Sequence, residues 1–227
     1  MNTLFLIPAR AGSKGLPGKN IKLLNNKPLF LYSVDFVREI ISEGDEICVS
    51  TNDDELIEIA EKSGVKIHFK RPENLSTDTA SSQEVIIHAL DYFENLNKHF
   101  DSVLLLQPTS PFRIKEDFEK MKNKYSSECD VVVSVKESKE NPYFTLFEEN
   151  ENGFLSKSKE SDFTRRQDCP NVYAFNGSMY LINTISLRSM PISNFKKIKK
   201  IIMPEKRSVD IDTLADWALA EFYLNNI

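Results

Sequence analysis

The sequence predicts an α/β fold, a three-layer α/β/α sandwich around a mostly parallel sheet. Short apolar runs, typical of strands buried on both faces, alternate along the chain with segments whose apolar residues recur at helical spacing. With 227 residues, 41% of them hydrophobic, the chain is long enough to bury the core of one ordinary domain. We therefore expect a single domain over residues 1–227, with helices on both faces of the sheet.

The first half of the chain contains clear strand and helix signals. Pro8 closes the first apolar run, and Pro28 stands where a proline is tolerated, in the first turn of a helix. Asp53 is a candidate helix cap and Gly64 a candidate helix terminator. We expect strands at residues 3–7, 47–50 and 65–69, and helices at residues 29–41 and between Asp53 and Gly64.

The second half continues the alternation. Ser81 and Glu84 form the Ser-x-x-Glu pattern of a capping box, and apolar residues from Val85 to Phe93 follow at helical spacing. We expect further strands at residues 102–107, 130–135, 172–182 and 198–203, and further helices at residues 115–125 and 213–224. The last helix is expected to pack through Trp217, Leu214, Ala218 and Phe222.

Residues 141–170 interrupt this rhythm. The segment is charged, carries aromatic and leucine side chains in short extended patches, and has Gly153 at an expected hairpin turn. Such an arm cannot bury its apolar side alone, so it either folds back on its own domain or packs against a second copy of the chain. We expect an inserted hairpin arm that serves as a lid or forms a homodimer.

Composition and charge exclude several classes of protein. Asp and Glu number 34 against 29 Lys and Arg, so the net charge of −5 lacks the basic excess that binding a nucleic acid backbone requires. The three cysteines are widely spaced, which indicates neither a disulfide framework nor a zinc site. No apolar run approaches the roughly 20 residues of a membrane span, and the first residues lack the basic start of a signal peptide. We expect a cytoplasmic protein with neither a membrane nor a nucleic acid as partner.

The first loop, residues 8–20, is a candidate for ligand binding. It follows the first expected strand, and α/β sheets bind ligands at the carboxyl ends of their strands. Glycines let backbone N–H groups approach an anion closely, and basic side chains add fixed positive charge. The loop holds three of the chain's seven glycines and three cations, namely Gly12, Gly15, Gly18, Arg10, Lys14 and Lys19. This combination favours a polyphosphate, while a basic solvated loop is the alternative.

Two common phosphate-binding motifs do not fit this loop. A Walker A loop needs one residue fewer between Gly12 and Gly18, and it has Ser or Thr where this chain has Asn20. The glycine spacing also differs from the GxGxxG pattern of dinucleotide-binding proteins. The loop therefore predicts phosphate binding without specifying a nucleotide.

Asp210 and Asp212 stand two residues apart near the carboxyl end of the chain. In an extended segment such residues point to the same face. Two convergent carboxylates suit Mg²⁺, which takes one or two carboxylates together with substrate phosphates and water. Alternatively, Asp212 caps the helix that begins near Thr213.

The loop and the aspartate pair belong to a series of motifs that resembles one family. The motifs are IPARAGSKGLPGKN at 7–20, KPL at 27–29, RPENLSTDTASS at 71–82, LQPTSPFR at 106–113, RQ at 166–167, NGSMY at 176–180 and DID at 210–212. In this order they resemble the CMP-sialic acid synthetases, or acylneuraminate cytidylyltransferases, with their CMP-legionaminate and CMP-pseudaminate synthetase relatives. The resemblance covers essentially the whole chain, and it implies a single nucleotidyltransferase domain with a Rossmann-like sheet.

The resemblance implies a reaction and a set of site residues. CTP and a nonulosonic acid would give a CMP-nonulosonate and pyrophosphate, with Mg²⁺ held by Asp210 and Asp212. The implied catalytic residues are Lys19, Arg10 and Asp210. The implied nucleotide-binding residues are Arg10, Gly12, Ser13, Lys14, Lys19, Asn20, Arg71, Ser81 and Ser82. The implied sugar-binding residues are Gln107, Arg166, Asn176 and Tyr180.

Alternatives to these assignments stay open in the sequence. The two serines are also the capping box of a helix, and Arg165 competes with Arg166 for the carboxylate that every nonulosonic acid carries. The protein could instead be a CMP-Kdo synthetase-like enzyme, a noncatalytic nucleotide-binding relative, or an oligomeric interaction protein that uses the arm. Which nonulosonic acid is bound depends on a few pocket residues that the motifs do not define.

Overall fold

The computed structural model describes residues 1–12 and 15–226. In this part of the chain, a six-stranded sheet has the order β10-β6-β9-β5-β1-β4. Its strands are β1 (Thr3–Pro8), β4 (Glu46–Ser50), β5 (Ser102–Leu106), β6 (Val131–Glu137), β9 (Tyr173–Asn183) and β10 (Ile198–Ile202). β9 is antiparallel to both of its neighbours, whereas the other strand pairs are parallel. The expected mostly parallel sheet is therefore confirmed.

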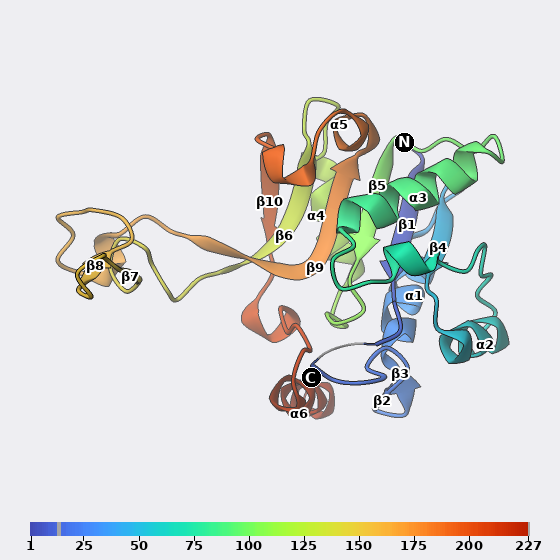
Figure 1. Ribbon diagram of the computed structural model, residues 1–227, viewed down its shortest axis with the longest axis horizontal. Helices are drawn as coiled ribbons and strands as arrows, with labels where there is room; N and C mark the ends of the chain where they lie inside the picture. The colour runs from blue at the N-terminus through green and yellow to red at the C-terminus, as the bar shows by residue number, and fades with distance from the viewer. Residues whose placement is uncertain (13–14, 227) are drawn as a thin grey trace.

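Helices cover both faces of the sheet, as expected (Figure 1). Along β1, Phe5 and Ile7 join the core cluster on one face, and Leu4 and Leu6 join the cluster on the other. The first cluster includes side chains of α1 (Leu29–Ile40), α2 (Asp54–Lys62) and α4 (Lys115–Lys124); the second includes side chains of α3 (Ser82–Glu94) and α5 (Thr184–Ser189). Because successive residues of a strand point to opposite faces, a fully apolar strand needs both helical layers.

Several short elements connect these layers. A two-stranded ribbon follows the first loop, and 3₁₀ turns lie between the longer elements. They are β2 (Leu23–Leu24), β3 (Lys27–Pro28), η1 (Glu73–Leu75), η2 (Arg166–Asp168), η3 (Ile192–Asn194) and η4 (Glu205–Arg207). The three cysteines are free and buried. Within the described residues, no helix is both long and apolar enough to cross a membrane.

The expected strand at residues 65–69 is wrong. The segment forms no ladder with β4, and a single parallel bridge joins Thr51 to Lys70 just beyond it. Val65 packs into the core cluster on one face of the sheet and Phe69 against the cluster on the other. The apolar residues of this segment are thus explained by burial at the sheet edge. Their side chains pack against the core although the backbone does not pair as a strand.

The last helix, α6 (Leu214–Asn225), uses a different face from the one expected. Trp217 and Ala220 are buried in a third apolar cluster, together with residues of the first loop and of the segment before the helix. Leu214 and Phe222, by contrast, are 67% and 58% exposed. The helix contacts the body along the line through Trp217 and Ala220, which are three residues apart and share a face, whereas Leu214 and Phe222 lie off this line.

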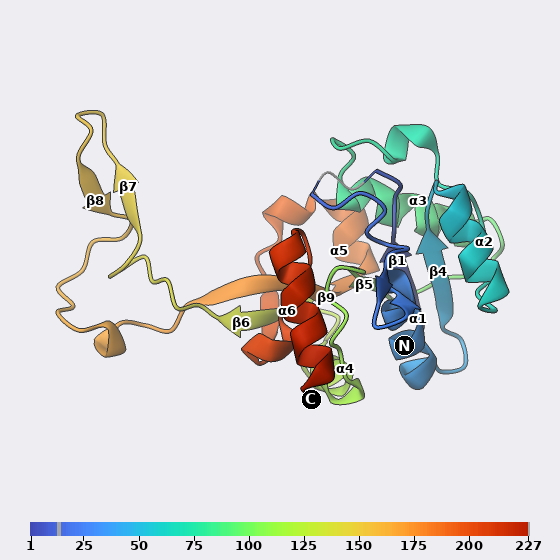
Figure 2. The same cartoon turned by 90° about the horizontal axis from the view of Figure 1, so that it is seen from below.

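The segment between β6 and β9 is the expected hairpin arm (Figures 1 and 2). Its strands β7 (Phe147–Glu149) and β8 (Leu155–Lys157) pair antiparallel, and Gly153 takes a positive φ of +78° in the turn between them. Both figures show the arm extending away from the sheet. At its tip, Phe154 and Leu155 are 71% and 69% exposed.

Candidate active site

Two adjoining cavities lie where β1 and β5 end. The larger has a volume of about 510 Å³ and the smaller about 240 Å³, and Pro8, Arg10 and Gln107 line both. The larger cavity is also lined by Gly15, Lys19, Asn20, Pro108, Thr109, Gly177, Tyr180, Asp210 and Asp212. The loop after β1 and the aspartate pair, almost 200 residues apart in the sequence, therefore face one another across one cavity.

Lys19 and Arg10, two basic side chains of the first loop, are held by acidic partners. The Lys19 side chain is 9% exposed, and its ammonium donates to the carbonyl oxygen of Ile211 at 2.7 Å and to Oδ1 of Asp212 at 2.8 Å. The Arg10 guanidinium lies 2.5 Å from a carboxylate oxygen of Asp78. Both cations are therefore positioned at the cavities before any phosphate is bound.

The remaining predicted residues of the loop differ in placement. Asn20 lines the larger cavity and donates from Nδ2 to the carbonyl oxygen of Arg10 at 3.1 Å. Gly12 has a positive φ of +75° and lines neither cavity. The predicted nucleotide contacts Ser13 and Lys14 lie outside the described residues.

Gly15 joins the loop to the aspartate segment. A Cβ atom at this position would lie 2.3 Å from the carbonyl oxygen of Asp212, closer than any real contact of that kind. Glycine therefore permits an approach of two backbones that another residue would prevent. At Gly15 the glycine-rich loop thus serves a contact within the protein.

Asp210 and Asp212 both line the larger cavity, as their spacing predicts. The alternative that Asp212 caps the following helix is wrong, because Thr213 is the cap and forms a capping box with Asp216. Burial raises the pKa of Asp210 above its ordinary value, and the negative charge of Asp212 raises it further. A hydrogen bond from Thr109 and the positive charge of Lys19 act in the opposite direction.

This pair of carboxylates fits a Mg²⁺ ion. The negative charge of Asp212 raises the pKa of Asp210, and a bound cation would relieve the repulsion between the two carboxylates. In the described part of the chain, no group of three or more His, Cys, Asp or Glu side chains is arranged to hold a metal. The pair therefore suits a cation that takes its remaining ligands from substrate phosphates and water, as Mg²⁺ does.

The smaller cavity contains Arg71 and Ser82. Arg71 donates from Nε to the Ser50 hydroxyl at 2.9 Å and from Nη2 to the Ser50 carbonyl oxygen. Burial lowers the pKa of Arg71 to about 10, and the positive charge of Arg10 contributes to the decrease. Two arginines that face the same small cavity favour an electron-rich ligand.

Ser81 and Ser82 have different surroundings. The sequence left open whether these two serines bind a nucleotide or cap the helix. Ser82 lines the smaller cavity. Ser81 is the N-cap of α3: its hydroxyl accepts from the backbone N–H of Glu84 at 3.2 Å, and the Glu84 carboxylate accepts from the Ser81 backbone at 2.8 Å. Ser81 thus forms the capping box and is absent from the lining of both cavities.

The predicted sugar-binding residues divide into two groups. Gln107 and Tyr180 line the larger cavity. Asn176 does not line it: its side chain is turned into the interior, where Oδ1 accepts from the Ser134 hydroxyl at 2.6 Å and Nδ2 donates to the Ser208 hydroxyl at 3.0 Å. The expected direct contact of Asn176 with the sugar is therefore not what the structure shows, because buried partners occupy its amide.

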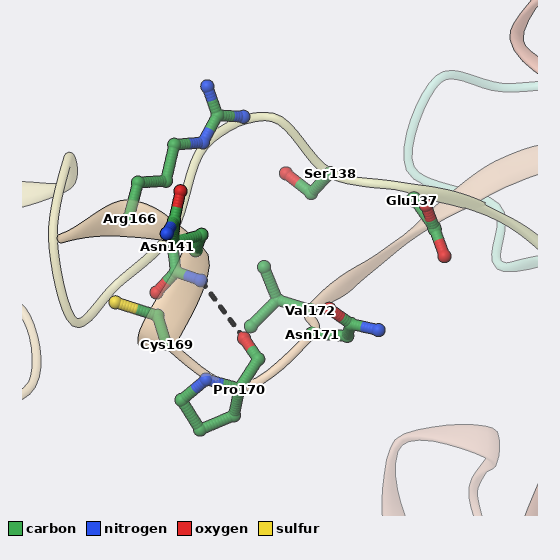
Figure 3. A pocket seen from close by; sticks show the side chains of 9 residues that line it. Glu137, Ser138, Asn141, Arg166, Cys169, Pro170, Asn171 and Val172 are labelled. Carbon is green, nitrogen blue, oxygen red and sulfur yellow. Dashed lines mark hydrogen bonds between the residues drawn. The ribbon is translucent and has the colours of Figure 1, made fainter.

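Arg166 lies in the arm, at a separate cavity of about 460 Å³ (Figure 3). This cavity shares no lining residue with the two at the sheet, and a hydrogen bond from Asn141 to the carbonyl oxygen of Pro170 joins two of its lining residues. Arg165 is engaged by Asp168 through two bonds of 2.8 and 3.0 Å, whereas no comparable bond of Arg166 occurs among the described residues. Arg166 is accordingly the arginine of the two whose guanidinium is not committed to a neighbour.

Comparison with known proteins identifies the family. The profile described as Cytidylyltransferase matches residues 4–221. The chain belongs to this family. It is 33% identical to the CMP-N,N'-diacetyllegionaminic acid synthase of Legionella pneumophila, covering 97% of this chain and 95% of that protein, and 31% identical to the pseudaminic acid cytidylyltransferase of Campylobacter jejuni, covering 97% and 95%.

A solved structure supports the fold of this cytidylyltransferase. The CMP:2-keto-3-deoxy-manno-octonic acid synthetase complexed with CTP superimposes with a TM-score of 0.71, covering 100% of this chain and 99% of that one. At 16% identity this likeness concerns the fold alone. The overall fold of this chain thus recurs in a synthetase that is distant in sequence.

Two residues of the site were missed by the sequence interpretation. Asp78 holds Arg10 at the smaller cavity, and Thr109 lines the larger cavity beside Asp210. Both stand in runs that carry the family resemblance: Asp78 lies in the run 71–82, which leads into α3, and Thr109 in the run 106–113, which begins at the end of β5. Position within those runs was the available signal, since neither residue type is distinctive alone.

Proposed function

We propose that this cytidylyltransferase is a CMP-nonulosonate synthetase, which converts CTP and a sialic-acid-like nonulosonic acid to the CMP-sugar and pyrophosphate. The observation that carries the proposal is the convergence of Lys19 and Arg10 with Asp210 and Asp212 on one cavity in a chain of this family. The names of the two relatives, a legionaminic acid synthase and a pseudaminic acid cytidylyltransferase, indicate the class of acceptor.

The reaction is an in-line displacement at the α-phosphorus. The anomeric oxygen of the sugar forms a bond to this phosphorus, the bond to the β-phosphate oxygen breaks, and the hydroxyl proton is transferred to a base. Negative charge grows on the departing pyrophosphate, so catalysis rests on positioning and on opposing charge. Lys19 and Arg10 supply that charge, and each would exchange its present carboxylate partner for a phosphate oxygen.

Asp210 and Asp212 would hold Mg²⁺. When bound, the ion would polarise the phosphate oxygens and offset the charge of the leaving group. Asp210 is also the carboxylate suited to accept the hydroxyl proton, because burial raises its pKa and so makes it a better base. Thr109 orients this carboxylate by a hydrogen bond.

The substrates divide between the two cavities. We assign the cytosine and ribose to the smaller one, where Arg71 and Ser82 offer hydrogen-bond donors beside the start of α3. The sugar would enter the larger one between Gln107 and Tyr180. Cysteines that are free and buried fit a reducing compartment, so we place the enzyme in the cytoplasm.

The test is release of pyrophosphate from CTP by the purified protein with Mg²⁺ and a panel of neuraminic, legionaminic and pseudaminic acids and Kdo. We expect turnover that requires CTP, Mg²⁺ and one of the first three acids, and we expect ATP and UTP to be poor donors. Asp212→Asn should lower the rate by roughly 100-fold or more, the scale of losing a charge-stabilising group. Turnover with Kdo alone would favour the related synthetase, and tight CTP binding without turnover would favour a noncatalytic protein.

A further inference from the structure

Arg113 carries a buried guanidinium directly beside the larger cavity. The residue is 7% exposed and ends the motif that begins at the carboxyl end of β5. Its Nε and Nη2 donate to the carbonyl oxygen of Ser178 at 3.2 and 2.9 Å, its Nη1 donates to the Ser33 hydroxyl at 3.0 Å, and its Nη2 also donates to the carbonyl oxygen of Gln107. One side chain thus connects the loop after β5 to β9 and to α1.

This guanidinium has no carboxylate partner among the described residues. Burial lowers the pKa of Arg113 to about 9, and the negative charge of Asp210 acts in the opposite direction. The group stays protonated at neutral pH, so the fold keeps an unpaired positive charge in its interior. Such a charge is costly, and an apolar side chain of similar size would fill the space at lower cost. Its presence therefore calls for a role other than stability.

The acceptors of Arg113 lie on both sides of the cavity. Gln107 lines the larger and the smaller cavity, and Ser178 directly follows Gly177, which lines the larger one. At this point β9 departs from regular pairing with β6: Val133 pairs with Tyr180, whereas Val135 pairs with Phe175. Residues 176–179 therefore bulge opposite Ser134, and this bulge directs Gly177 into the cavity.

Asn176 holds the same bulge from inside. Its Oδ1 accepts from the backbone N–H of Ser178 at 3.2 Å as well as from the Ser134 hydroxyl, and its Nδ2 reaches Ser208, two residues before Asp210. A Cβ atom on Gly177 would lie 3.0 Å from Oδ2 of Asp210. The position of the bulge thus limits where the Asp210 carboxylate can lie.

We propose that Arg113 is a positioning residue for the synthetase reaction, which fixes Gln107 and the 176–179 bulge so that Gln107 and Asp210 face one another across the larger cavity. The planar fork of its guanidinium suits it to hold two carbonyl groups and a hydroxyl at fixed angles. This inference rests on the proposed function. It adds a residue that lines neither cavity and that acts on the reaction through Gln107 and the 176–179 bulge.

The main test compares Arg113→Lys with the wild type. Lysine keeps the positive charge but lacks the planar fork, so it cannot hold the three acceptors together. We expect kcat to fall by roughly 100-fold, the effect of an ångström-scale displacement, and KM for the acid to rise. The dissociation constant for CTP should change far less than kcat. A variant with wild-type kcat and KM would overturn the proposal, as would a loss of activity that merely matches the fraction of protein unfolded.

Arg38→Lys is the matched control. Arg38 also donates to a backbone carbonyl, that of Ser63 at 2.7 Å, and lies on α1 away from the cavities. Its replacement should leave kcat and KM unchanged. If Arg113→Lys does not fold, Ser33→Ala is the alternative, because it removes one acceptor of the guanidinium without touching the cavity lining. This variant should show a smaller decrease in kcat, again with little change in the dissociation constant for CTP.

Hydrogen exchange tests the positioning role of Arg113 independently of the proposed function. In Arg113→Lys, the backbone amides of residues 107, 109, 110 and 176–179 should exchange faster than in the wild type, while those of α2 should not. Unchanged exchange in both segments would refute the positioning role. If the wild type turns over no nonulosonic acid at all, the proposed function fails, and the exchange pattern still decides whether Arg113 holds the two segments.

Discussion

The ammonium of Lys19 lies 2.8 Å from Oδ1 of Asp212. The two residues are 193 positions apart, and their contact joins the glycine-rich loop to the aspartate segment. The pair links the proposed phosphate-binding and metal-binding parts of the site. A phosphate oxygen bound by Lys19 would replace Asp212 as its partner. A cation bound by Asp212 would likewise replace Lys19.

Lys19→Met should abolish most activity with little loss of stability. Methionine has a similar shape and suits the buried stem of Lys19, while the Asp212 side chain is 68% exposed and remains solvated without its partner. We expect kcat to fall by roughly 100- to 1,000-fold, as when one charge-stabilising donor is removed. Lys22→Met is the control, because the Lys22 ammonium lies 4.7 Å from the centroid of the Trp217 ring and outside the cavity lining. A similar loss in both variants would argue against a specific role for Lys19.

Gly177→Ala should damage activity more than stability. The new Cβ atom would press on the Asp210 carboxylate, in addition to the strain of a positive φ of +72°. Gly153→Ala imposes the same strain at a φ of +78° in the arm, where the new Cβ atom would lie 3.8 Å from the Glu149 carboxylate. Each change should lower stability by about 1 kcal/mol, or about 2–4 °C in Tm, but only Gly177→Ala should lower kcat, by roughly tenfold or more. Equal activity of the two variants would contradict this expectation.

Asp130 should stabilise the fold in a pH-dependent manner. Hydrogen bonds from the backbone N–H groups of Lys197 and Lys196 and from the Ser186 hydroxyl hold the pKa of Asp130 below its ordinary value. Because the folded-state pKa is lowered, this stabilisation is complete above the unfolded-state pKa of about 3.9 and is lost as the pH falls through the folded-state pKa.

Asp130→Asn tests this assignment. The variant should melt several degrees below the wild type at pH 7, because an amide group replaces one of the two accepting oxygens. The difference in Tm should shrink as the pH falls below about 4, because the unfolded wild type protonates this carboxylate there, whereas the folded protein does so only at a lower pH. Thermal melts of both proteins between pH 7 and the lowest pH at which they fold provide the measurement. A difference that is constant with pH would show that the carboxylate charge contributes nothing.

The arm should complete the site of a second subunit. Arg166 lies in the arm, whereas Gln107 and Tyr180 lie at the sheet, so we propose that in a homodimer Arg166 binds the sugar carboxylate at the partner's cavity. Arg166→Ala and Asp210→Asn should each be nearly inactive. Heterodimers of the two variants, co-expressed and purified through two tags, should regain about half of the wild-type activity, since one of their two sites is intact. Heterodimers as inactive as the parents would place Arg166 in its own subunit's site or outside any site.

Local patterns in the sequence determined most of the fold of this cytidylyltransferase. Apolar strands, helical periodicity and the capping box at Ser81 involve residues within one or two turns of each other, so they can be recognised without knowing the fold. The placement of Asp210 and Asp212 on one cavity also follows locally, from the two-residue repeat of an extended chain. The hairpin at Gly153 is a further example.

The tertiary structure decided which way several side chains turn. The amide of Asn176 is engaged by Ser134 and Ser208, 42 and 32 positions away. Arg113 donates to acceptors on β9, on α1 and in the loop after β5. The segment 65–69 and the face of α6 were settled in the same way, by packing against distant parts of the chain. Contacts between residues far apart in sequence decide such features. Examples are the direction of side chains at a bulge, strand pairing at a sheet edge and the reach of the arm. Periodicity and motif spacing carry no information about such contacts.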